Sequence, residues 1–231
     1  MIGIMAAMAK EAAPLLEALE GDTARTISGR VFHSGLLCGR EVVIVECGIG
    51  KVNAAMCAEA LILAYKPDLV INVGVGGTLS GDLQIGDIAV ARDLVQYDVD
   101  TTALGDPPGF VSTVNRVAFP CADWAVDGIL RTVADMEGVK ARAVRIASGD
   151  RFTDDAPTTD YISRTFQAEV CEMEGCPIAQ VCWINQTPCA VIRGISDTTA
   201  GAHGIEYEQC GDLAAANAAR ALMGFLEKLD R

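Results

Sequence analysis

The chain is poor in the side chains that build metal centres and disulfide frameworks. It contains only two histidines, His33 and His203, and its nine cysteines are an odd number with no CxxC pair among them. Structural zinc sites and disulfide scaffolds need closely spaced or paired ligands of these types. We therefore expect no metal ion, and we expect cysteines such as Cys57, which lies inside an apolar run, to be small buried hydrophobic residues.

Positive charge and long apolar runs are also scarce. Eighteen Lys and Arg against 31 Asp and Glu give a net charge of −13, and a surface of that sign repels nucleic-acid phosphates and anionic lipids. No uninterrupted apolar stretch reaches the ~20 residues that span a bilayer, and the N-terminal segment meets Lys10 and Glu11 before a secretory apolar region is complete. We expect no nucleic-acid partner, no membrane contact and a cytoplasmic location.

The chain does have enough apolar sequence for one large core. Apolar residues make up 51% of its 231 residues, and we expect a single domain over residues 1–231. Short apolar runs alternate with longer helical patterns, which is typical of a sheet covered by helices on its faces. Residues 26–38 indicate additional antiparallel pairing, so the sheet should be mixed. The pattern predicts strands near 2–6, 42–46, 69–73, 87–94, 143–147 and 189–195, and helices over 10–19, 50–65, 122–136, 158–166, 174–184 and 213–229.

The predicted helix over residues 51–65 (KVNAAMCAEALILAY) carries few polar groups. These are chiefly Lys51, Asn53 and Glu59, so the helix is apolar around most of its circumference. Such a helix needs burial on more than one side. Two arrangements meet this need: a subunit interface, or complete burial inside one domain.

Polar clusters lie at the ends of predicted strands, where open α/β sheets usually bind their ligands. The first cluster covers residues 8–11, the second covers 172–174 and the third covers 193–197. Each has a plain structural alternative. Arg193 and Asp197 could form a salt bridge, or Asp197 could cap a helix, and the carboxylates of the second cluster could complement a helix dipole.

A glycine cluster follows the predicted strand at 69–73. Gly74, Gly76 and Gly77 would let the backbone turn sharply or come close to a ligand. The spacing is not that of the GxGxxG fingerprint, so alone it is weak support for a nucleotide.

These segments, taken in order, resemble the methylthioadenosine/S-adenosylhomocysteine nucleosidases of the purine and uridine phosphorylase superfamily. The matching segments cover essentially the whole chain: GIMAAMAKE, CGIGKVNAA, INVGVGGTLSGDLQIGD, YDVDTTALGDP, ASGDRF, CEMEG, VIRGISD and the closing helix. The resemblance implies an α/β fold, a three-layer α/β/α sandwich around a mixed central sheet, usually as a homodimer. It also implies hydrolysis of the N-glycosidic bond of 5′-substituted adenine nucleosides without a cofactor, in methionine salvage.

The resemblance assigns four catalytic residues. Asp197 would be the general acid that delivers a proton to N7 of adenine, and Glu11 would polarise the attacking water. Glu174 would bind the ribose hydroxyls, and Arg193 would help to hold the water and the carboxylates.

The resemblance also implies a substrate-binding set. Ser196 would support the loop of Asp197, Phe152 would stack on the base, and the backbone near Thr153 would read the base edge. The ribose and 5′-thio region would be lined by Met8, Ile49, Met173 and Tyr207, with Leu104 reaching in from the partner subunit. The set is completed by Ala7, Val75 and Glu172.

The chemistry supports this assignment. Glycosidic cleavage passes through an oxocarbenium-like sugar and leaves an anionic base unless that base is protonated. An acid near the base and carboxylates near the sugar meet both needs. A nucleoside phosphorylase, the closest alternative, must bind phosphate with cations and N–H donors, whereas a carboxylate at Glu11 repels phosphate and favours water. A non-catalytic nucleoside sensor is a further alternative, which the presence of Glu11, Glu174 and Asp197 opposes.

The chain departs from the family pattern at three of these positions. Val75 stands where many members carry serine, and Leu104 and Tyr207 stand where phenylalanine is familiar. We expect adenine preference to survive, while the preferred 5′ group stays open between methylthio, homocysteinyl, plain deoxy and the bulkier aminodeoxyfutalosine side chain.

Overall fold

The computed structural model describes residues 1–198 and 203–229. Its strands are β1 (Ile2–Ala6), β2 (Glu20–Ile27), β3 (Arg30–Leu37), β4 (Arg40–Glu46), β5 (Leu69–Thr78), β6 (Ile88–Gln96), β7 (Ala118–Pro120), β8 (Ala141–Ser148), β9 (Val170–Glu172) and β10 (Cys189–Thr198). Its helices are α1 (Ala9–Glu17), α2 (Lys51–Tyr65), α3 (Asp123–Val133), α4 (Ala156–Phe166), α5 (Gly175–Ile184) and α6 (His203–Lys228), with short 3-10 turns η1 (Thr102–Leu104) and η2 (Ser112–Val114). In the described part of the chain, no helix is both long and apolar enough to cross a membrane.

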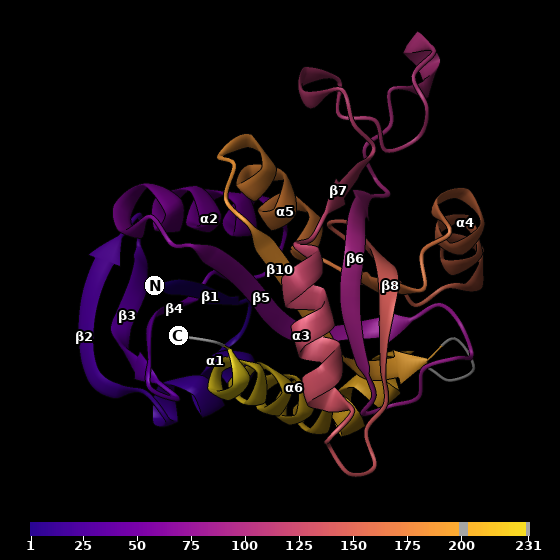
Figure 1. Cartoon of the computed structure of the whole chain (residues 1–231). Coiled ribbons are helices and arrows are strands. Elements are labelled where there is room, and N and C mark those ends of the chain that lie inside the picture. Colours follow the sequence, from indigo (N-terminus) through magenta and orange to yellow (C-terminus); the bar gives the residue numbers. More distant parts are fainter. Residues whose placement is uncertain (199–202, 230–231) are drawn as a thin grey trace.

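One mixed sheet connects the whole structure. Ten strands take part, in the order β10-β6-β8-β9-β5-β1-β4-β3-β2 with β7 added to β6. Because β10 also pairs with β5, the strands β5, β9, β8, β6 and β10 close into a ring. Figure 1 shows α2 and α5 on one side of the sheet and α1, α3 and α6 on the other. This arrangement confirms the predicted three-layer α/β/α fold with a mixed sheet.

The central strands are covered on both of their faces. Every residue of β1 is buried, and β5 and β10 are buried over almost their whole length. Such strands are continuous apolar runs, as expected for parallel strands between two helical layers. Each fully buried Ile, Val or Leu stabilises the fold by roughly 1.5–3 kcal/mol. The carboxyl ends of β1, β5 and β10 are therefore a fixed platform for polar side chains.

The cysteine prediction is confirmed for most positions. All nine cysteines are free, and seven of them are buried. Cys38 and Cys210 are partly exposed.

Several boundaries differ from the sequence prediction. The antiparallel segment begins at Glu20 instead of residue 26, and β5 continues through the glycines to Thr78 instead of ending before them. Helix α6 begins at His203 instead of residue 213. Its first turns carry mostly polar residues and contact the candidate site through Tyr207, so they lack the apolar period that marks a core helix.

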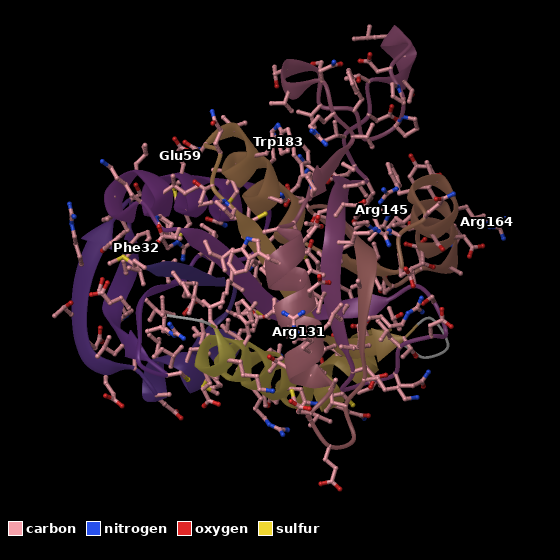
Figure 2. All side chains as sticks on the ribbon, in the orientation of Figure 1. Phe32, Glu59, Arg131, Arg145, Arg164 and Trp183 are labelled. Carbon is pink, nitrogen blue, oxygen red and sulfur yellow. The ribbon has the colours of Figure 1, made fainter. Side chains whose placement is uncertain are left out.

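The apolar helix α2 is not completely buried. Leu61 lies in the core, but Val52 is 79% exposed and Leu63 is 65% exposed. Figure 2 shows Trp183 of α5, itself half-exposed, and Glu59 of α2 at the same outer edge of this helix pair. Complete burial inside one domain is therefore wrong for α2, and the subunit-interface alternative stays open.

Candidate active site

A cavity of about 300 Å³ lies at the carboxyl ends of β1, β5 and β10. This is where ligands bind in open α/β sheets. The predicted residues that line it are Ala7, Met8, Glu11, Ile49, Val75, Phe152, Thr153, Glu172, Met173, Glu174, Ser196, Asp197 and Tyr207. Residues that the prediction did not include among its site residues are Gly76, Gly77, Arg151 and Cys171.

Glu11 is held at the start of α1. Its Oε2 accepts the N–H groups of Ala7 (2.9 Å) and Met8 (3.0 Å), and its Oε1 accepts the N–H of Val75 on β5 (3.0 Å). Burial raises the pKa of the Glu11 carboxyl, against the lowering effect of Arg193 and of the three N–H donors. The result is a fixed carboxylate that faces the cavity and has a raised affinity for a proton.

Arg193 lies beneath these carboxylates and does not line the cavity itself. Its side chain is 2% exposed, and its Nη2 donates to Asn72 and to Glu172. Its Nε has no hydrogen-bond partner among the described residues. Arg193 thus provides a buried positive charge among three carboxylates, those of Glu11, Glu172 and Glu174.

Both carboxylate oxygens of Glu172 accept hydrogen bonds from the protein. Its Oε2 accepts the N–H groups of Glu174 (2.9 Å) and Gly175 (2.6 Å) at the start of α5 and the Nη2 of Arg193, while Ser148 donates to its Oε1. A carboxylate at this place satisfies helix N–H groups and complements the helix dipole. The geometry therefore suits Glu172 to anchoring α5 and Arg193.

Glu174 also lines the cavity, and its carboxylate oxygens accept fewer hydrogen bonds from the protein than those of Glu172. Its Oε1 accepts the N–H of Gly50 (2.8 Å), and its Oε2 lies 4.0 Å from Nη2 of Arg193. Burial, and then the charge of Glu172, raise the pKa of Glu174 to about 7, against the lowering effect of Arg193 and the Gly50 N–H. Its protonation therefore changes near neutral pH.

Asp197 enters the cavity through a bulge in β10. The pairing with β5 runs Ile195 to Gly76 and then Asp197 to Gly77, so Ser196 is an extra residue. Neighbouring side chains on a regular strand point to opposite faces, and a bulge relaxes this alternation. Both Ser196 and Asp197 line the cavity as a result, and the Ser196 hydroxyl donates to Oδ1 of Asp197 (2.7 Å).

The glycines of β5 make room for two of the carboxylates. A Cβ added at Gly74 would lie 2.5 Å from Oε1 of Glu11, and one added at Gly77 would collide with Oδ2 of Asp197. As the sequence indicated, these glycines permit another group to come close to the backbone. They lie within β5 and not in a loop after it. What comes close here is a pair of acidic side chains.

The outer wall of the cavity is aromatic and apolar. The rings of Phe152 and Tyr207 meet edge to face with centroids 5.7 Å apart, and the Tyr207 hydroxyl donates to Sδ of Met8 (3.3 Å). Such a wall suits a flat base or an apolar substituent. On the inner side, Sγ of Cys171 lies 2.9 Å from Oγ1 of Thr153. Cys171 was missed because its sequence context indicates a core residue, although it directly precedes the acidic cluster.

Leu104 lies away from this chain's own cavity. It belongs to η1 and is 82% exposed. Figure 1 shows the segment between β6 and β7, here called the arm (residues 97–117), extending away from the sheet. Such a projecting apolar side chain is available to a neighbouring molecule.

The sequence matches the phosphorylase superfamily over residues 1–227, and the chain belongs to this family. The chain is 36% identical to a 5′-methylthioadenosine/S-adenosylhomocysteine nucleosidase of Shewanella pealeana, with 99% of each chain covered. It is 32% identical to an aminodeoxyfutalosine nucleosidase of Helicobacter pylori, again over 99% of each chain. The nucleosidase of Neisseria meningitidis in complex with methylthio-immucillin-A is 30% identical and superimposes with a TM-score of 0.93, with 99% of each chain covered. These comparisons confirm the resemblance seen in the sequence.

Proposed function

We propose that this protein hydrolyses the N-glycosidic bond of 5′-substituted adenine nucleosides, such as 5′-methylthioadenosine, S-adenosylhomocysteine and 5′-deoxyadenosine, and releases adenine. The observation that carries the proposal is the convergence of Glu11, Glu174 and Asp197 on one cavity from α1, the start of α5 and β10. A cavity of about 300 Å³ is at the lower end of the range for small-molecule sites, which is roughly 300–1,000 Å³.

Asp197 acts on the base. As the general acid it gives a proton to N7, so that adenine leaves as a neutral molecule. The Ser196 hydroxyl, bonded to Oδ1, fixes the orientation of the carboxyl group. Phe152 stacks on the base, and the backbone near Thr153 reads the base edge.

Glu11 and Glu174 act on the sugar. Glu11 accepts a proton from the attacking water, which its raised pKa favours. Glu174 binds the ribose hydroxyls, and Arg193 and Glu172 keep the group of carboxylates in place. Negative charge at this place also stabilises the cationic, oxocarbenium-like sugar of the transition state.

The cations at the site do not favour phosphate as the nucleophile. Arg193 is engaged by Glu172, Arg151 pairs with Asp155 (2.6 Å), and Lys10 lies over the Tyr207 ring at 4.3 Å. A phosphate would also approach the carboxylates of Glu11 and Glu174, and like charges repel. The hydrolase is therefore favoured over the phosphorylase.

Adenine release from methylthioadenosine in phosphate-free buffer tests the proposal. The nucleosidase releases adenine at a rate that added phosphate does not raise. Release that depends on phosphate would show a phosphorylase, and binding without any product would show a nucleoside sensor.

We propose that the apolar residues Met8, Ile49, Met173 and Tyr207 recognise the 5′ substituent. The apolar composition of this wall favours a thioether or a plain deoxy group over a charged group directly at C5′. A hydrolase that prefers aminodeoxyfutalosine is the alternative, since one relative carries that name. Values of kcat/KM for a panel of 5′-substituted adenosines distinguish the two, because the preferred substrate has the highest value.

We further infer a homodimer in which Leu104 of one subunit completes the cavity of the other. The exposed apolar residues of α2 and α5 (Val52, Leu63 and Trp183) are a surface that such an assembly would cover. We also propose that residues 1–231 form one nucleosidase domain that works in the cytoplasm, in methionine salvage, without nucleic-acid or membrane partners.

A further inference from the structure

Three charged residues outside the cavity lining form a closed set of hydrogen bonds at the base of the arm. Nζ of Lys51 donates to Oδ1 of Asp98 (2.6 Å), the N–H of Lys51 donates to Oδ1 of Asp150 (2.7 Å), and the N–H of Asp150 donates to Oδ2 of Asp98 (2.9 Å). We call these three residues the clamp. They come from three separate segments: Lys51 is the first residue of α2, Asp98 follows β6 and Asp150 follows β8.

The clamp touches two walls of the cavity through its chain neighbours. On one side, Lys51 follows Gly50, whose N–H is bonded to Oε1 of Glu174 (2.8 Å). On the other side, Asp150 stands two residues before Phe152, which lines the cavity. A shift of the clamp therefore reaches both the ribose carboxylate and the base-stacking ring.

Within the clamp, Asp150 is exposed, but the Lys51–Asp98 pair is more sheltered than a surface ion pair. The side chains of Lys51 and Asp98 are 18% and 30% exposed. Exposed ion pairs add little to stability. The clamp joins the first residue of α2 to the segments after β6 and β8, so its main effect is on how these three segments lie relative to one another.

We propose that Asp98, Lys51 and Asp150 are positioning residues for the hydrolysis, which set the Gly50 N–H against Glu174 and fix the loop that carries Phe152. This inference rests on the proposed function. Asp98→Asn leaves one acceptor oxygen and no charge, so Nζ of Lys51 and the N–H of Asp150 can no longer both be bound. The start of α2 then withdraws from Glu174.

Loss of the Gly50 N–H bond would shift the pKa of Glu174 in one direction. A hydrogen bond to a carboxylate lowers its pKa, so the pKa of Glu174 rises when that bond is lost. The other groups that face Glu174 are Glu172, Arg193, Glu11 and Cys47, and they stay in place. The acidic limb of the pH profile of kcat/KM therefore moves to higher pH.

The test compares Asp98→Asn with Asp135→Asn in the full-length protein. Asp135 is a matched control because it pairs with Lys228 on the surface, outside the cavity. We expect Asp98→Asn to lower kcat/KM for methylthioadenosine at pH 7 by about 10- to 100-fold, since small displacements near reacting groups have effects of this size. The acidic limb should move upward in this variant alone, with Tm unchanged in both.

Three further variants separate positioning from general damage. The double variant Lys51→Met with Asp98→Asn should lose no more than the worse single variant, because both substitutions break the same contact between Nζ of Lys51 and Asp98. Lys51→Arg should restore part of the rate that Lys51→Met loses. An unmoved acidic limb in Asp98→Asn, or losses that add in the double variant, would overturn the proposal.

The failure of the proposed function looks different. If the wild-type protein releases no adenine, the hydrolysis is wrong, and the clamp is then tested by calorimetric titration with methylthioadenosine. Weaker binding by Asp98→Asn than by Asp135→Asn supports the clamp in that case. Equal binding by the two variants contradicts it.

Discussion

At the scale of single residues, the carboxylates of Glu11 and Asp197 fit into the site because β5 has glycine at the positions next to them, Gly74 and Gly77. Gly77→Ala would place a methyl group against Oδ2 of Asp197. We expect kcat to fall on the order of 100-fold through displacement of the acid. Gly81→Ala is the control, since an added Cβ at Gly81 meets no atom within 4 Å. Equal kcat in the two variants would contradict this role of Gly77.

The ionised carboxylate of Glu174 should lower the stability of the folded protein at neutral and higher pH. Its pKa is raised by burial from 4.5 to about 7, so between these values the folded state binds more protons than the unfolded state. Stability therefore falls as pH rises through this window. Glu174→Gln removes the effect, so its Tm should exceed that of the wild type at pH 8 by more than at pH 5, while activity falls. A Tm difference that does not grow with pH would be evidence against the raised pKa.

At the scale of elements, the first turns of α6 complete the apolar wall. Tyr207→Ala removes the edge contact with Phe152, and burial of a side chain of this size is worth roughly 1.5–3 kcal/mol. KM for methylthioadenosine should rise about 10-fold or more, by a larger factor than KM for adenosine, whose 5′ group is polar. Tyr161→Ala on α4 is the control, because Tyr161 packs on Phe166 outside the cavity. Equal rises in KM for both substrates would contradict an apolar 5′ wall.

The long elements were predictable from the sequence, and the short ones were not. The continuous apolar runs of β1 and β10 and the helical run of α2 were each located to within a few residues. Strands β7 and β9 have three residues each, too few to show a period. The Ser196 bulge and the ring closure of the sheet depend on contacts between distant segments, which one sequence does not reveal.

The candidate site, too, was predictable in part: its residues could be found from the sequence, but their contacts could not. The carboxylates were found because they stand where strands end, and the motifs of a known family gave them roles. The structure adds what depends on three dimensions: the clearance above Gly74 and Gly77, the commitment of Glu172 to α5, and the contact between Cys171 and Thr153.

At the scale of the whole molecule, a dimer in which Leu104 on the arm of one subunit completes the cavity of the other predicts that two inactive variants restore activity when mixed. Leu104→Asp spoils the site of the partner, and Glu11→Gln spoils the site of its own subunit. When the two inactive variants are unfolded and refolded together, roughly one site in four is intact by random pairing in a two-fold dimer. A mixture of Glu11→Gln with Asp197→Asn is the control, since both defects lie in the same subunit's site and no site is restored. Absence of activity in the first mixture would contradict this dimer.

The central claim is that Asp197 and Glu11 act on opposite ends of one glycosidic bond. The measurement that tests it most directly is the single-turnover rate of adenine release by Asp197→Asn and Glu11→Gln, with Tm recorded for each. Each general acid or base contributes roughly 10²- to 10⁴-fold, so we predict losses of that size in both variants without loss of the fold. Near-native release by either variant would contradict the account.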